Sequence, residues 1–154
     1  MRSSTFFILF LAINFGGLVL GSWLMDHGPT TDWYLTLNKA PWTPPGWVFG
    51  VTWTLIMICF SGYLALAFQV LNTKRLQILF VLSLFLNVIW NYVFFNVHQI
   101  GWGLIIIILL TIIVVTIFGT VKHNRLRTTR YLLLPYMIWL CLATSLNLYI
   151  LLFN

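Results

Sequence analysis

Amide and aromatic side chains recur at helical spacing inside long apolar stretches of this sequence. Asn87, Trp90, Asn91 and Phe94 stand at positions i, i+3, i+4 and i+7, which share one face of an α-helix. An amide in an apolar environment costs free energy unless it is hydrogen-bonded. This face therefore predicts either hydrogen bonds between helices or contacts with a bound ligand.

Two further stretches carry comparable faces. Phe49 and Trp53 are one helical turn apart. A third face consists of four residues, Tyr136, Trp139, Ala143 and Asn147. Turned inward, three aromatic faces would line a cavity with flat walls and a few hydrogen-bonding groups, which suits a planar apolar ligand with polar edges. For each residue taken singly, the alternative is core packing or an interhelical hydrogen bond.

Conventional catalytic and metal chemistry is not indicated. The apolar stretches contain no Asp, Glu, Lys, Arg or His, which argues against a proton-coupled pump or an ion channel. No HExxH, GxSxG or phosphate-loop motif is present. Cys59 and Cys141 are interpreted as reduced thiols rather than a disulfide, and no metal site is expected. His27 and His98 are interpreted as solvated loop residues, with an axial ligand to a haem iron as the alternative.

The elements that must position these residues follow from composition. The chain is 61% hydrophobic and 6% charged, against about 25% charged in an average soluble domain. A helix needs about 20 apolar residues to cross a hydrocarbon core of about 30 Å. Runs such as 104–110 do not alternate as barrel strands would. We expect a single all-α membrane domain, 1–154, with five transmembrane helices at about 5–25, 46–71, 76–97, 100–121 and 131–153.

The basic residues predict an orientation. Seven of them, and no acid, fall on one side of a five-span topology: Arg2, Lys74, Arg75, Lys122, Arg125, Arg127 and Arg130. The other side carries Lys39 with Asp26 and Asp32. The positive-inside rule then predicts a cytoplasmic N-terminus and an external C-terminus. Because the basic residues lie in short gaps rather than on one globular face, the net charge of +6 indicates membrane orientation and not nucleic-acid binding.

Four local features complete the expected architecture. The first apolar stretch is interpreted as a retained helix rather than a cleaved signal. The loop 26–45 is rich in Trp, Tyr, Leu and Pro and is expected to be ordered, either as a lid or as a set of interfacial aromatic anchors. Thr43 is expected to cap the second helix. Gly17 and Gly21 form a GxxxG motif, which predicts close helix packing within the monomer or, alternatively, a dimer contact.

Several motifs, in order along nearly the whole chain, resemble the translocator protein family (TspO/MBR, the peripheral-type benzodiazepine receptors). The most specific one is Trp42-Thr43-Pro44-Pro45-Gly46-Trp47-Val48-Phe49, with Trp53 following. The others are Trp33-Tyr34, Leu86-Asn87 with Trp90 and Phe94-Phe95, Gln99-Ile100-Gly101-Trp102, and Pro135-Tyr136 with Trp139, Ala143-Thr144 and Leu146-Asn147.

The resemblance implies a five-helix bundle, often dimeric, with a pocket under the first loop and with porphyrins such as protoporphyrin IX or isoquinoline carboxamides as ligands. No cofactor is required. By the same resemblance Trp53 and Trp139 would flank the ligand, Asn87 would offer a hydrogen bond, and Trp33 and Tyr34 would belong to the lid. Further ligand contacts would come from Phe49, Trp90 and Phe94, with Ala143 and Leu146 as the floor.

One departure from the family pattern concerns sterols. The family's sterol-binding segment needs a basic residue after an aromatic one near the C-terminus, whereas this chain continues from Tyr149 to Asn154 without one. Its absence argues against tight cholesterol binding and fits a bacterial member of the family.

Three functional hypotheses follow. The first is a porphyrin-binding membrane receptor or sensor. The second adds light-dependent degradation of the bound porphyrin, with Trp53 and Trp139 as the reacting side chains. The third is a transporter of porphyrin or another apolar solute.

Overall fold

The computed structural model describes residues 3–120 and 124–154, and five long helices dominate it. They are α1 (Ser3–Leu24), α3 (Gly46–Val70), α4 (Lys74–Asn91), α5 (Ile100–Thr120) and α6 (Leu134–Phe153). Shorter elements are η1 (Gly28–Thr30), α2 (Asp32–Thr36), the π-helical η2 (Tyr92–Asn96), η3 (Asn124–Leu126) and η4 (Thr129–Leu133). The all-α class and the five predicted spans are confirmed, since five helices among these residues are long and apolar enough to cross a membrane.

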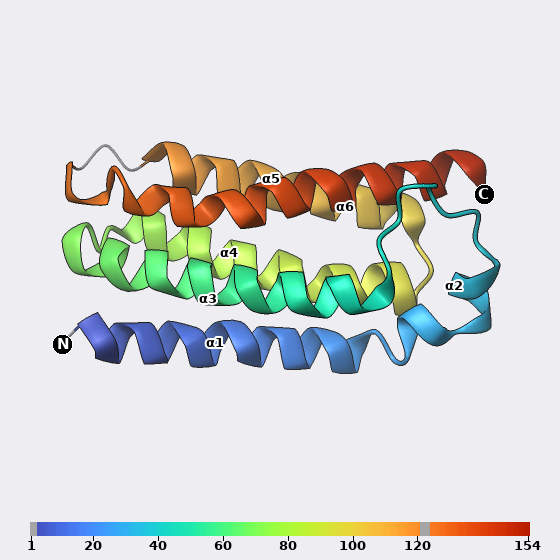
Figure 1. Cartoon of the computed structure of the whole chain (residues 1–154), viewed down its shortest axis with the longest axis horizontal. Helices are drawn as coiled ribbons and strands as arrows, with labels where there is room; N and C mark the ends of the chain where they lie inside the picture. Colours follow the sequence, from blue (N-terminus) through green and yellow to red (C-terminus); the bar gives the residue numbers. More distant parts are fainter. Residues whose placement is uncertain (1–2, 121–123) are drawn as a thin grey trace.

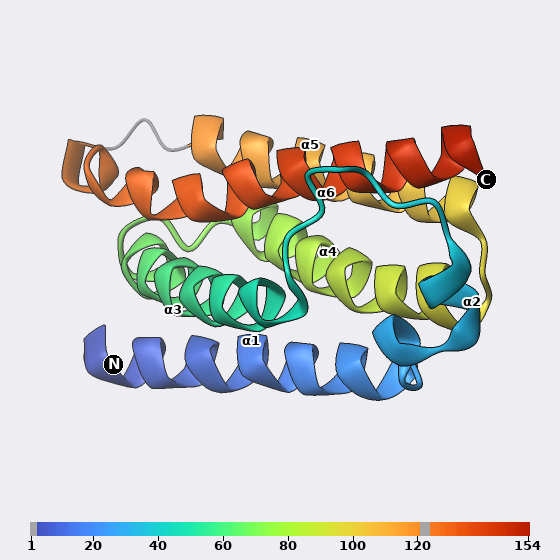
Figure 2. The ribbon, with the colours of Figure 1, turned by 45° about the vertical axis from the view of Figure 1, so that its right-hand side comes forward.

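The five long helices lie side by side and nearly parallel, with the described ends of the chain at opposite ends of the bundle (Figure 1). Helix α1 packs against α3 and α4, while α5 packs against α4 and α6. Figure 2 shows the loop after α2 crossing the end of the bundle near α6 before the chain enters α3. This arrangement encloses the space between α3, α4, α5 and α6.

Proline determines where two helices start. Helix α3 begins at Gly46 directly after the extended Pro45, which makes no side-chain cap. The predicted cap by Thr43 is therefore wrong: its hydroxyl lies too far ahead of the helix and donates instead to the Ala40 carbonyl at 2.7 Å. Helix α6 carries Pro135 in its first turn, where a missing N–H costs nothing.

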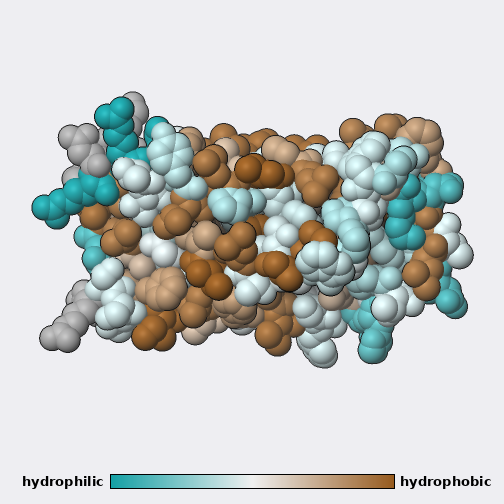
Figure 3. All heavy atoms as spheres, viewed as in Figure 1, coloured by the Kyte–Doolittle hydropathy of each residue, from teal (hydrophilic) through white to brown (hydrophobic). Residues whose placement is uncertain are grey.

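The surface separates into an apolar belt and two polar ends (Figure 3). Large hydrophobic side chains are exposed along the belt, among them Val19 and Ile138, as expected where lipid replaces water as the solvent. At one end lie Lys74, Arg75, Arg125, Arg127 and Arg130. Two members of the predicted basic set, Arg2 and Lys122, lie outside the described residues.

The GxxxG motif faces inward. A Cβ added at Gly21 would lie 2.8 Å from the Asn91 side-chain nitrogen on α4, and one at Gly17 would lie 2.6 Å from Leu84. At the adjacent Gly16 no atom would lie within 4 Å. The two motif glycines thus bring α1 close to α4 within one chain, which supports the packing alternative.

A buried polar pair between α1 and α3 has no counterpart in the predicted set. The Asn14 side-chain nitrogen donates to the Ser61 hydroxyl at 2.8 Å, and both residues are buried. The pair satisfies two polar groups that would otherwise lie unpaired among apolar side chains.

Candidate functional site

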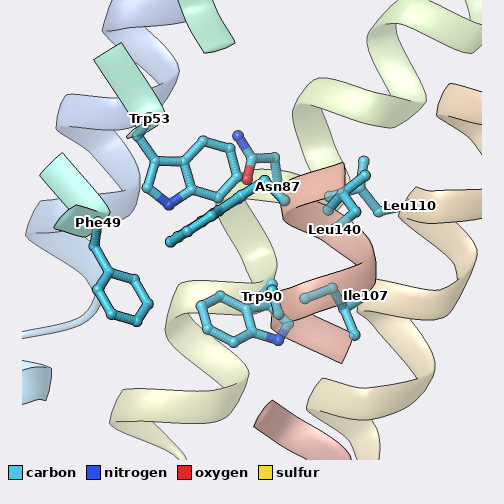
Figure 4. Close-up of a pocket in the computed structure, with 9 residues that line it drawn as sticks. Phe49, Trp53, Asn87, Trp90, Ile107, Leu110 and Leu140 are labelled. Atoms are coloured by element: carbon cyan, nitrogen blue, oxygen red, sulfur yellow. The ribbon is translucent and has the colours of Figure 1, made fainter. Parts of the chain in front are cut away.

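A small cavity lies between four helices, closer to the loop end of the bundle. Its volume is about 40 Å³. It is lined from α3 by Phe49 and Trp53, from α4 by Asn87 and Trp90, from α5 by Ile107 and Leu110, and from α6 by Trp139, Leu140 and Ala143 (Figure 4). Such a volume holds water-sized molecules, and ligand pockets are usually about 300–1,000 Å³. In this conformation the cavity is therefore too small for a ligand of that size.

Aromatic rings form the α3–α6 side of the cavity. The Trp139 ring packs edge-on against Phe49 at 5.1 Å and against Trp53 at 6.5 Å between ring centroids. Trp53 also packs against Tyr136 at 5.9 Å. In each pair the edge of one ring lies against the face of the other, the arrangement that aromatic pairs prefer.

The Asn87 side chain supplies the amide of the cavity wall. It is buried, and within the described part of the chain its amide has no hydrogen-bond partner. Its backbone carbonyl is already engaged, because the Asn91 side-chain nitrogen donates to it at 2.9 Å. An amide without a partner at the cavity wall can accept a hydrogen bond from a ligand there or donate one to it.

Asn147 has a different role. Its side-chain oxygen accepts the indole N–H of Trp90 at 3.3 Å, and its nitrogen donates to the Ile100 carbonyl at 3.1 Å. It joins α4, α5 and α6 and does not line the cavity. For this residue the interhelical alternative holds.

The residues predicted to share one face of the third span have different neighbours in the structure. Asn91 points toward Gly21 on α1, whereas Asn87 and Trp90 line the cavity. Phe94 stacks on Trp90 at 5.1 Å with an interplanar angle of 11° and lies outside the lining. Phe94 thus lies on the same side of the helix as Trp90, as its spacing predicts, and one turn nearer the loop end, where the chain has passed from α4 into the π-helical η2.

The other predicted contacts lie around the cavity at different depths. Ala143 lines it, while Leu146 is buried without lining it. Trp33 and Tyr34, on α2, pack on Phe94 at 5.8 and 6.5 Å between ring centroids. They cover the aromatic cluster above the cavity and do not contact the cavity itself. Burial raises the pKa of the Tyr34 phenol, which therefore stays neutral.

The loop after α2 is fastened to α6 at two places. Asn38 donates its backbone N–H to the Asn154 side-chain oxygen at 2.8 Å and its side-chain nitrogen to the Phe153 carbonyl at 3.0 Å. The Asn154 nitrogen returns a hydrogen bond to the Asn38 carbonyl at 3.3 Å. Farther along, the Trp42 indole N–H donates to the Ser145 hydroxyl at 3.2 Å. We refer to the Asn38–Asn154 contact as the loop clamp.

The histidines and cysteines lie apart from this site. His98 is exposed and stacks on Trp33 at 4.0 Å between ring centroids. His27 is also exposed. Cys59 and Cys141 form no disulfide. Among the residues with described positions, no cluster of His, Cys, Asp and Glu could hold a metal ion.

Comparison with known proteins decides the family. The sequence model of the TspO/MBR family matches residues 7–153. The chain belongs to the TspO/MBR family. It is 35% identical over 147 residues to the tryptophan-rich protein TspO of Archaeoglobus fulgidus, covering 94% of this chain and 91% of the relative.

Other TspO/MBR relatives come from bacteria and animals. The human translocator protein is 31% identical over 79% of this chain and 74% of its own length. The tryptophan-rich sensory protein of Cereibacter sphaeroides is 29% identical over 75% of this chain and 73% of its own length. With its five apolar spans, this TspO/MBR chain is an integral membrane protein.

Proposed function

We propose that the chain is a membrane receptor or sensor that binds porphyrins such as protoporphyrin IX, and isoquinoline carboxamides, between α3 and α6. The observation that carries the proposal is the unpartnered Asn87 amide facing a cavity walled by Phe49, Trp53 and Trp139. Flat apolar walls with one amide match a planar ligand with a polar edge. The name of the Cereibacter relative, tryptophan-rich sensory protein, agrees with a sensing role.

The small volume of the cavity makes binding a conformational event. At about 40 Å³ it is far smaller than a tetrapyrrole, so helices α3 and α6 must separate or the loop above must move. We assign the movement to the loop, because its polar contacts with α6 are hydrogen bonds at exposed positions, namely the loop clamp and the Trp42–Ser145 hydrogen bond. The proposal thus assigns the loop 26–45 the role of a lid, with Trp33 and Tyr34 on it.

Tryptophan fluorescence tests the proposal. The purified protein in detergent is titrated with protoporphyrin IX, alongside the variants Trp53→Ala, Trp139→Ala and Asn87→Leu. Trp47→Ala is the matched control, because Trp47 lies on the same helix as Trp53 but is exposed. We expect saturable quenching in wild type and in Trp47→Ala, and weaker binding in the other three variants. Linear quenching in every sample would mean partitioning into the micelle and would refute the pocket.

The proposal includes a light-dependent reaction of the bound porphyrin beside Trp53 and Trp139. The double variant Trp53→Phe, Trp139→Phe should retain much of the binding but lose the illumination-dependent decrease in porphyrin absorbance. Unchanged decay in that variant would remove the two tryptophans from the reaction. Porphyrin uptake into sealed proteoliposomes above the level of empty liposomes would instead favour a transporter, to which the name of the human relative points.

We also propose a bacterial cell membrane as the location, with the N-terminus in the cytoplasm and the C-terminus outside, and a homodimer as the assembly. The concentration of Lys and Arg at one end of the bundle supports this orientation.

A further inference from the structure

The cavity wall has no charged group. Its nine lining residues are aromatic or aliphatic apart from Asn87, and Trp90 already gives its indole N–H to Asn147. Burying an ionised carboxylate without a partner costs far more than a hydrogen bond to an amide returns. A planar ligand with acidic substituents must therefore keep its acidic edge outside this cavity, at a boundary with water.

Helix geometry determines which boundary is within reach. Phe49 and Trp53 belong to the first two turns of α3, and Asn87 and Trp90 to the last turns of α4. At about 1.5 Å per residue, Trp53 lies about 10 Å along α3 from its start at Gly46 and about 25 Å from its end at Val70. An acidic edge can thus reach the loop end of the bundle, and the arginine-rich end is too distant.

Lys39 is the cation on the loop at this end. Its ammonium lies 4.8 Å from the centroid of the Tyr34 ring and 3.3 Å from the Leu35 carbonyl oxygen. Neither Asp26 nor Asp32 forms an ion pair with it within the described residues. An ammonium has three N–H donors, so two of them remain for a ligand.

Aromatic contacts connect Lys39 to the cavity. The Tyr34 ring beneath the ammonium packs on Phe94 at 6.5 Å, and Phe94 stacks on the cavity residue Trp90 at 5.1 Å. A ligand held between α3 and α6, with its acidic edge toward the loop in the position described here, would have these rings and then the ammonium beyond that edge. The other basic side chains at this end of the bundle are His27 and His98.

We propose that Lys39 is the counter-ion for the acidic substituents of the bound ligand, so that the loop selects planar ligands with a carboxylate edge. This inference rests on the proposed function, because it concerns a ligand held in the same cavity. In this proposal the loop binds the carboxylates of the ligand, and α3, α4 and α6 bind its apolar ring system.

The test compares protoporphyrin IX, which has two carboxylates, with its neutral dimethyl ester. Binding of both is measured at pH 8 for wild type, Lys39→Gln, Lys39→Arg and Lys74→Gln. Since a hydrogen bond to a charged group is worth about a tenfold change or more in affinity, Lys39→Gln should weaken the diacid about tenfold and leave the ester unchanged. Lys39→Arg should restore the preference for the diacid, and Lys74→Gln, at the opposite end, should change neither affinity.

Three results would overturn the inference. Equal weakening of both ligands in Lys39→Gln would mean that Lys39 only supports the fold of the loop. Unchanged affinities in Lys39→Gln, with saturable binding of both ligands, would remove Lys39 from recognition and leave the proposed function intact. Failure of both ligands to saturate the wild-type protein would overturn the proposed function, and this inference with it.

Discussion

Trp90 and Asn147 form a hydrogen bond of 3.3 Å that joins the cavity wall on α4 to α6. Because Asn147 also donates to the Ile100 carbonyl at 3.1 Å, one amide holds three helices together beside the cavity. Trp90 is thereby fixed in orientation, with its ring turned to the cavity and its N–H turned away from it.

Replacing Asn147 by Ala should lower the stability of the bundle. The change leaves the Trp90 N–H and the Ile100 carbonyl without their side-chain partner, and interhelical hydrogen bonds in membranes contribute about 0.6 kcal/mol each, up to about 1.7. Thermal unfolding in detergent should show a lower Tm than wild type. Asn96→Ala, at an exposed position, is the control, and equal Tm values for the two variants would contradict the assigned role.

Gly21→Ala and Gly16→Ala should have opposite effects. A Cβ at position 21 would meet the Asn91 amide at 2.8 Å, whereas position 16 has open space. Overpacking costs about 1–3 kcal/mol, while alanine in place of an exposed helical glycine gains up to about 1 kcal/mol. The two Tm values should therefore fall on either side of wild type. If Gly21→Ala instead matched Gly16→Ala, close packing of α1 on α4 would be refuted.

The buried Asn14–Ser61 pair should show coupling in a double-mutant cycle. Ser61→Ala alone leaves the Asn14 amide without its partner at 2.8 Å, and Asn14→Leu alone leaves the Ser61 hydroxyl unpaired. The double variant should be more stable than the sum of the single losses predicts, by about 0.5–2 kcal/mol. Additive losses would mean that the contact contributes no net coupling.

Asn38→Ala should loosen the loop above the cavity. The change removes the side-chain hydrogen bond to the Phe153 carbonyl at 3.0 Å and weakens the other contacts of the clamp. Hydrogen exchange of the amides in segment 37–45 should become faster, while exchange in α3 and α6 stays unchanged. Asn72→Ala, in the turn at the opposite end of the bundle, is the control, and faster exchange in both variants would indicate general destabilisation instead.

Cysteine labelling in intact cells should establish the orientation. Thr36 and Thr128 are exposed at opposite ends of the bundle, and each can be changed to Cys in a chain whose own Cys59 and Cys141 have been changed to Ala. A membrane-impermeant maleimide should label the cysteine at position 36 in intact cells and the one at 128 only after permeabilisation. The reverse pattern would refute the cytoplasmic N-terminus.

Much of the fold follows from the sequence because a membrane span is a local property. About 20 consecutive apolar residues suffice to predict a helix across lipid, without knowledge of its neighbours. The aromatic and amide residues of the cavity were predictable for a related reason, since Phe49, Trp53, Asn87 and Trp139 stand out by type and helical spacing.

The remaining features depend on departures from regular helices. Spacing predicts that Phe94 lies beside Trp90, but nothing in the sequence marks the π-helical η2 that contains Phe94 or shows that the cavity stops at Trp90. Residue type alone predicts Thr43 as the cap, whereas the helix begins directly after Pro45, two residues farther along the chain. Asn14 was detectable, since it is also an amide in an apolar stretch; its partner Ser61 depends on how α1 crosses α3.

The small cavity has a thermodynamic consequence for any ligand. If the binding-competent form is open, the apparent Kd equals the intrinsic one divided by the open fraction, so an open fraction of about one in a hundred weakens binding about a hundredfold. The contacts that hold the loop shut then compete directly with the ligand. Substitutions near Asn154 could therefore change the apparent Kd through the loop alone, without contacting the ligand. The cavity wall on α3 and α6 would stay unchanged.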